Sequence, residues 1–192
     1  HLPNQMPFQT PKDFENYIAR LTAFPAYVDQ HIANMKLGLT RGMTLPQVVL
    51  QDYELTISAQ IVDRVEKSVF YKPFEIFPSS FTKRDREQLR AAGTTAIRNS
   101  VIPGYRTFLN FMMEDYIPNA RATIGAFELP NGRDYYEHLV RRFTTLDLSI
   151  DKIHQIGLDE VERIQDEMLA TMQETGFHGN FSSFLTFLRT NP

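Results

Sequence analysis

The sequence predicts an all-α protein, an irregular orthogonal or bundle-like array of about seven to nine helices. Apolar residues recur at steps of three and four along most of the chain, which is the spacing of one helix face. Thr, Ser or Asn precedes several of these stretches as a helix cap. No stretch alternates apolar and polar residues as a half-buried strand does, and the sequence has no glycine-rich phosphate loop or internal repeat.

The first helical segment begins at Thr10, which caps it, with Pro11 in its first turn and Asp13 facing the free backbone amides. Pro25 interrupts the count, so one bent helix or two abutting helices fit equally well. Glycines from Gly38 onward end the segment. Its apolar face is formed by Phe14, Ile18, Leu21, Val28, Ile32 and Met35.

Two further segments fill the region to residue 81. Thr44 and Gln47 have the spacing of a capping box, which predicts a helix with an apolar residue at every fourth position from Val49 to Val65. Residues 70–81 contain Pro73, Pro78 and four Phe without helical periodicity. We expect an ordered loop held by its aromatic side chains.

A second long helical segment starts at a cap formed by residues 82–85 and continues to about Tyr116. Pro103 is expected to kink or divide it. Residues 125–132 then form the most turn-like connection in the chain, with room for a short extended piece. The apolar face of this segment includes Leu89, Ala92, Ala96, Val101, Tyr105, Leu109 and Met112.

Three more helices are predicted after this turn. The first covers about 133–143, and the second, the longest, is capped by Ser149 and stopped by Gly176. Asn180 caps a short last helix. The inward residues of that helix are expected to be Phe184, Phe187 and Leu188.

Composition excludes several classes of function. A net charge of -3 gives no basic surface for nucleic acid or an anionic membrane. The absence of Cys excludes disulfides and thiolate metal sites. No apolar run reaches the ~18–20 residues of a membrane span, and the N-terminus does not have the pattern of a signal peptide.

We expect the 192 residues to be a single helical portion of a longer protein, because the chain lacks an initiator Met and ends just after a helix. The one internal boundary that the sequence indicates lies near residues 70–81, in the Phe/Pro-rich loop.

The order of short motifs along the chain resembles the bacterial family called domain of unknown function 885 (DUF885), which includes lipoproteins. The likeness spans most of the chain and is strongest after Tyr105. The motifs are Arg41-Gly42, Lys72-Pro73-Phe74, Ile102-Pro103-Gly104-Tyr105, Tyr116 to Arg121, Gly132 to Tyr136, Phe143-Thr144-Thr145, Ile153 to Leu158, Glu160-Val161 and Phe184 to Pro192.

This resemblance implies a largely helical protein of the gluzincin-like metallopeptidase group. The family's zinc motif, His-Glu followed by Pro-Gly-His-His, lies nearer the C-terminus and does not occur in this sequence. We therefore expect no metal ligand and no cofactor in this portion, and zinc in the intact protein. The resemblance is compatible with an exported or periplasmic lipoprotein, and the residues leave the cytoplasm equally open.

The histidines themselves give only weak metal pairs. Asp134 with His138, and Asp151 with His154, each share a helix face, but no two His have helical metal spacing. A hydrogen bond or a surface ion pair explains either pair more simply.

Four residues are candidates for substrate binding. Tyr135 and Tyr136 carry phenols that can donate to an oxyanion, and Arg142, joined by Arg121 across a helix contact, can hold a peptide carboxylate. The alternative is amphipathic packing with solvated arginines. His154 is a fifth candidate, which would orient a substrate or a catalytic group, and its alternative is a buried His satisfied by a neighbouring helix.

The sequence thus predicts a helical portion of a zinc-dependent peptidase that supplies one wall of the substrate cleft and is inactive alone. Its partners would be the remaining portion of its own polypeptide and a peptide substrate. The alternative is a non-catalytic helical module that binds or scaffolds another protein through its Phe-rich loop and its Tyr/Arg face.

Overall fold

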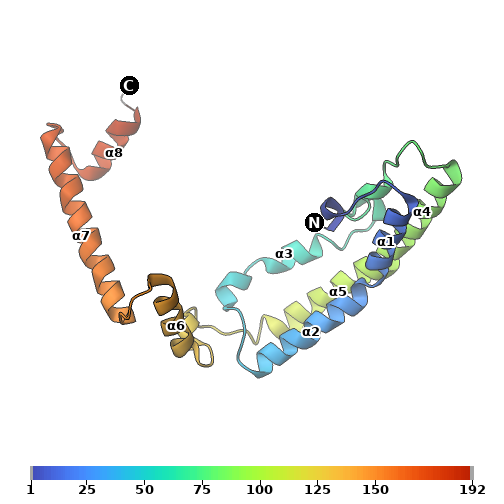
Figure 1. Ribbon diagram of the computed structural model, residues 1–192, viewed down its shortest axis with the longest axis horizontal. Coiled ribbons are helices and arrows are strands. Elements are labelled where there is room, and N and C mark those ends of the chain that lie inside the picture. Colours follow the sequence, from blue (N-terminus) through green and yellow to red (C-terminus); the bar gives the residue numbers. More distant parts are fainter. Residues whose placement is uncertain (1, 191–192) are drawn as a thin grey trace. The chain divides into compact units, whose positions relative to one another are not determined.

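The computed structural model describes residues 2–190, and all regular structure in this range is helical (Figure 1). One isolated bridge joins Pro46 and Arg121 without forming a strand. The prediction of an all-α array is confirmed. The α-helices are α1 (Pro11–Thr22), α2 (Phe24–Thr40), α3 (Tyr53–Ser58), α4 (Lys83–Ala96), α5 (Ile102–Phe111), α6 (Gly132–Thr144), α7 (Ile150–Glu174) and α8 (Phe181–Thr190).

The chain divides into two compact units, His1–Pro130 and Asn131–Pro192. The boundary lies in the predicted turn at 125–132. The aromatic loop at 70–81, where the sequence indicated a boundary, lies inside the first unit.

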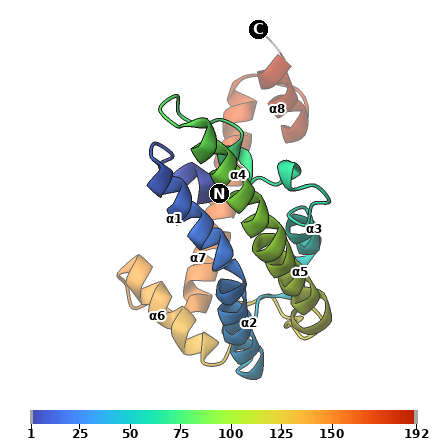
Figure 2. The ribbon, with the colours of Figure 1, turned by 90° about the vertical axis from the view of Figure 1, so that its right-hand side faces the viewer.

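In the first unit, two long helical segments run side by side in the same direction. Helix α1 packs against α4, and α2 against α5, so equivalent ends of the two segments meet (Figures 1 and 2). Residues 41–82 return the chain from the end of α2 to the start of α4, with α3 packed on α5. Two clusters of buried side chains fill this arrangement, one centred on Phe14, Tyr17 and Phe74 and the other on Phe111 and Met112.

Both long segments begin at the predicted caps. Thr10 accepts a hydrogen bond from the Asp13 amide at 3.3 Å, and the Asp13 carboxylate accepts one from the Thr10 amide at 2.8 Å. Thr82 and Asp85 repeat this reciprocal pair. The first segment consists of two abutting helices rather than one, because it is interrupted at Ala23 ahead of Pro25.

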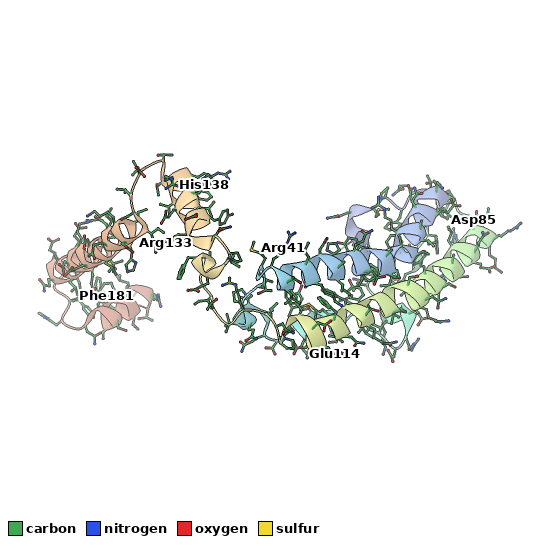
Figure 3. All side chains as sticks on the ribbon, turned by 90° about the horizontal axis from the view of Figure 1, so that it is seen from below. Arg41, Asp85, Glu114, Arg133, His138 and Phe181 are labelled. Atoms are coloured by element: carbon green, nitrogen blue, oxygen red, sulfur yellow. The ribbon has the colours of Figure 1, made fainter. Side chains whose placement is uncertain are left out.

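The second segment is divided just before Pro103 but does not end there. Helix α4 continues into α5 through a π-helical turn, Ile97–Val101, and a second π-turn extends α5 to Tyr116 (Figure 3, where Asp85 and Glu114 label the two ends). In the first π-turn the Ile102 amide donates to the Ile97 carbonyl, five residues earlier. This wider turn accommodates a proline that has no amide to donate and whose ring would crowd an ordinary turn.

The prediction of a single helix from Thr44 to Val65 is wrong. Thr44 Oγ1 accepts a hydrogen bond from the Arg121 amide at 3.0 Å, and the Gln47 amide donates to the Arg121 carbonyl at 2.8 Å. The capping groups are therefore engaged by a segment remote in sequence. A short 3-10 turn follows, and Asp52 adopts a left-handed backbone with φ 59° before α3.

The aromatic loop at 70–81 is ordered, as predicted. The Phe14 ring stacks on Phe77 with centroids 4.9 Å apart, and the Tyr17 hydroxyl donates to the buried Phe70 carbonyl at 3.0 Å. Burial raises the pKa of Tyr17, so this phenol stays a donor. The loop thereby closes the core over α1 and α4.

The second unit has its predicted helix ends. The Ser149 hydroxyl accepts from the Lys152 amide at 3.2 Å, Gly176 ends α7 with φ +70°, and the Asn180 side chain accepts from the Ser183 amide at 2.9 Å. Phe184 is buried as expected. Phe187 and Leu188 were also expected to be inward, but they are 41% and 58% exposed: Phe187 contacts Phe177 at the surface, and Leu188 lines an open groove between α7 and α8.

Candidate functional site

Tyr135, Tyr136 and Arg142 lie together on α6. This helix begins after Asn131 and ends at Thr145, both in left-handed conformations. Tyr135 and Arg142 are seven residues apart, so they share one helix face (Figure 3 shows α6 with Arg133 and His138 labelled). Tyr135 is 57% exposed and Tyr136 38% exposed. Both phenols are therefore accessible to a ligand.

The Arg142 guanidinium is available as well. Its carbon lies 5.9 Å from the centroid of the Phe143 ring, a cation–π contact that orients the group and leaves its N–H donors free. Within the described residues Arg142 forms no salt bridge. An exposed guanidinium on the same helix face as the Tyr135 phenol can bind a carboxylate.

His154 is exposed on α7, in contrast to the alternative of a buried histidine. Farther along α7 the charges pair locally. Arg163 contacts Glu160 and Glu167 at 2.7 Å each, and these hydrogen bonds raise the pKa of Arg163. This acidic face is a solvated helix surface on which Glu160 and Glu167 pair with Arg163.

Arg121 is not on the helices α6 and α7 that carry the other four candidates. It belongs to the first unit, where its Nε donates to the Thr44 carbonyl at 3.0 Å and its Nη1 donates to the carbonyls of Thr123 and Gly125 at 2.8 Å each. The bond to Thr44 fastens the segment after α5 to the start of the return segment, and the two bonds from Nη1 hold the local turn at 121–125. The geometry gives Arg121 a structural task, and the substrate role predicted for it stays a prediction.

Residues 2–190 contain no group of three or more His, Asp or Glu side chains placed to hold a metal ion. The pairs Asp134 with His138 and Asp151 with His154 thus lack a third ligand in the described part of the chain.

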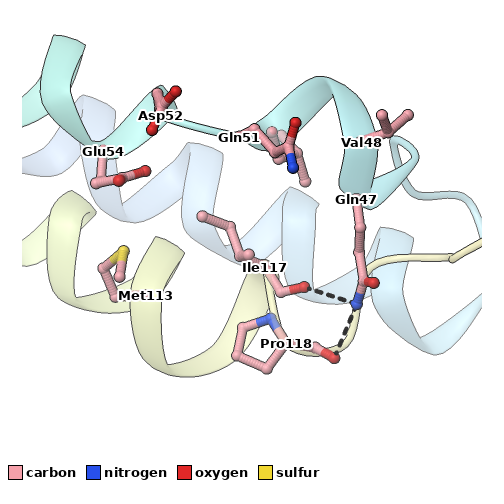
Figure 4. A pocket seen from close by; sticks show the side chains of 9 residues that line it. Gln47, Val48, Gln51, Asp52, Glu54, Met113, Ile117 and Pro118 are labelled. Carbon is pink, nitrogen blue, oxygen red and sulfur yellow. Dashed lines mark hydrogen bonds between the residues drawn. The ribbon is translucent and has the colours of Figure 1, made fainter.

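An open groove in the first unit escaped the sequence analysis. It has a volume of about 600 Å³ and lies between the Gln47–Leu50 turn, α3 and the end of α5 (Figure 4). Gln47 closes one end by donating from its side chain to the Ile117 carbonyl at 3.3 Å, while Asp52 and Glu54 lie along the rim. The local feature that marks this groove is the left-handed backbone of Asp52, and the sequence alone does not reveal it.

The outer surface beside this groove is apolar. Val48, Val49 and Leu55 are all more than half exposed, although Val49 belongs to a predicted core face. Exposed apolar side chains gathered in one part of a surface are typical of a contact with another protein segment.

The protein is a helical chain whose first unit has a closed core and whose second unit presents open helix faces. All of it, residues 1–192, matches the family described as "Bacterial protein of unknown function (DUF885)", and the chain belongs to this family.

A solved structure is similar to this chain. It is described as "the putative lipoprotein from Colwellia psychrerythraea" and has 25% sequence identity and a TM-score of 0.77. The match covers 98% of this chain and 33% of that chain, so the present chain spans about a third of the length of its structural relative. No curated protein matches the sequence. None of the described helices has both the length and the hydropathy to cross a bilayer.

Proposed function

We propose that this chain is the helical part of a zinc-dependent peptidase that lines one side of the substrate cleft. The metal and its water-activating glutamate would be held by another part of a longer polypeptide. Membership of the family and the one-third coverage of the structural relative support this proposal.

The observation that carries it is the open surface of the second unit. Tyr135, Tyr136 and Arg142 combine two phenols and a guanidinium on one exposed helix, a set suited to bind a peptide's carbonyl oxygens and carboxylate. His154 would position a group on the neighbouring helix α7. These residues bind and orient, and bond cleavage is the task of the part that holds the metal.

The test uses the full-length polypeptide. Its zinc content would be measured by mass spectrometry, and peptide cleavage would be screened with and without a chelator. We expect bound zinc and chelator-sensitive cleavage. In Arg142→Gln, KM should rise about tenfold with kcat unchanged, because the interaction is made equally in the ground and transition states. Arg84→Gln, at an exposed arginine of α4, is the matched control. A zinc-free, inactive polypeptide would refute the proposal.

The apolar surface beside the groove favours a second candidate, a non-catalytic module that binds another protein. Here Val48→Glu would abolish association with that protein, whereas Arg142→Gln would leave it intact. If the native complex still forms with Val48→Glu, this second candidate function is refuted.

A further inference from the structure

An aromatic pocket in the first unit contains none of the candidate substrate-binding residues. It has a volume of about 550 Å³ and lies where α1 ends, α2 begins and α5 passes beneath. Its aromatic walls and its one cation come from Phe24, Tyr27, Phe70, Tyr105 and Arg20.

The aromatic side chains of the pocket pack against one another and form a continuous wall. The Tyr105 centroid lies 4.9 Å from Phe24 and 6.1 Å from Phe70, and Tyr27 stacks beside Phe24 at 6.2 Å. Phe70 is buried, whereas Tyr27 is largely exposed. The pocket thus has a closed aromatic floor and an open edge, which favours a flat apolar group.

The polar groups at this pocket have no partners. In the described part of the chain, Arg20 forms no salt bridge, and the hydroxyls of Tyr27 and Tyr105 form no hydrogen bond. Burial and the neighbouring Tyr27 raise the pKa of Tyr105, so its hydroxyl remains protonated. One guanidinium with phenolic donors is suited to a single carboxylate, which it can bind bidentately.

Gly104 fixes the floor of the pocket. A Cβ at this position would lie 2.7 Å from Cδ1 of the Phe24 ring, so only glycine lets that ring lie flat on α5. The next residue, Tyr105, then stacks against the same ring. The Ile102-Pro103-Gly104-Tyr105 motif therefore builds one wall of the pocket.

We propose that this pocket binds a small aromatic carboxylate, with its ring packed on the wall formed by Phe24, Phe70 and Tyr105 and its carboxylate on Arg20. The proposal is independent of the peptidase function, since none of these residues belongs to the open surface of the second unit.

The probe for this site is 3-phenylpropionate, titrated into the 15N-labelled 192-residue chain and followed by NMR. We expect saturable shifts of the amides at Arg20, Ala23 and Tyr105 with a dissociation constant on the order of 1 mM, a value in keeping with the small size of the ligand. The uncharged 3-phenylpropan-1-ol should bind about tenfold more weakly, because it cannot pair with the guanidinium.

Two variants and a control decide the outcome. Arg20→Gln should weaken 3-phenylpropionate about tenfold, and Gly104→Ala should abolish its binding by displacing Phe24. Arg84→Gln, which removes an exposed cation elsewhere, should bind like the parent chain. If Gly104→Ala loses the helical circular dichroism signal of the parent chain, it is unfolded, and the proposal is then tested by Arg20→Gln alone. Unsaturable shifts, or equal binding by the parent chain and Arg20→Gln, would overturn the proposal.

Discussion

Helices α1 to α5 of the first unit bury Phe14, Tyr17 and Phe74 completely, whereas α7, the longest helix that the structure describes, buries only Met172. Both units have well-formed caps, so local signals operate equally in each. The difference is tertiary. The first unit has a core of its own, and the second presents apolar side chains such as Val161 and Ile164 on an open face. Helix formation and core formation are thus specified separately in this sequence.

The largest effect expected from this difference concerns two phenylalanines. Phe74→Ala should lower the free energy of unfolding by about 3–5 kcal/mol, because it removes a fully buried ring. Phe143→Ala, at a residue 78% exposed, should change it by less than about 0.5 kcal/mol. Urea unfolding monitored by circular dichroism measures both. Equal losses would mean that the two units do not differ in packing.

Substitutions of two helical glycines by alanine should change the free energy of unfolding by smaller amounts and in opposite directions. A Cβ at Gly93 would overlap the Phe74 ring, so Gly93→Ala should cost about 1–3 kcal/mol. A Cβ at Gly157 would have no neighbour within 4 Å, so Gly157→Ala should stabilise α7 by up to ~1 kcal/mol through helix propensity. Thermal unfolding compares them. Destabilisation by Gly157→Ala would indicate that the α7 face is closely covered.

Removal of single helix caps should reveal a smaller difference in stability between the two units. Thr82→Ala deletes a reciprocal cap in the first unit and should cost about 1 kcal/mol of its unfolding free energy. Ser149→Ala deletes the cap of α7 and should lower helicity without moving the transition of the first unit. Hydrogen exchange resolved by residue measures each unit by itself. A shared response would show that the two units unfold together.

The smallest effect expected is a pH dependence within the first unit. Hydrogen bonds from the backbone and side chain of Thr10 hold the pKa of Asp13 below its usual value. Since the folded pKa is the lower one, the stabilisation is present above the unfolded value of about 3.9 and is lost as pH falls through the folded pKa. Melting temperatures of the parent chain and Asp13→Asn, recorded between pH 7 and pH 2, should converge at the acid end. Parallel curves would contradict this assignment.

Interactions between residues close in sequence made much of the fold predictable. The caps at Thr10, Thr82, Ser149 and Asn180 each depend on a partner three residues away, which the sequence displays directly. The helical class, the order of the long helices and the aromatic loop follow from similar local information.

Interactions between remote residues were not predictable. The Thr44 hydroxyl is engaged by Arg121, 77 residues away, and no local pattern reveals that competition. Pro103 is a breaker by local rules, but the π-turn before it depends on how the segment packs.

The same distinction between local and remote interactions applies to the candidate site. The sequence named Tyr135, Tyr136 and Arg142 as one set, and the structure shows all three exposed on α6. The groove between Gln47 and Ile117 joins segments 70 residues apart, and therefore has no signature in either segment alone. The roles of Tyr135, Tyr136, Arg142 and His154 in substrate binding remain predictions.

The parallel course of the two long segments has a consequence for the protein during its synthesis. The side chains of α1 are covered by Phe74, α4 and the π-turn at Ile97, all of which leave the ribosome much later. At roughly 5–20 residues per second, α1 spends several seconds as a nascent helix with Phe14 and Tyr17 unprotected. This interval makes the N-terminal helix a natural client for chaperones that hold emerging apolar segments.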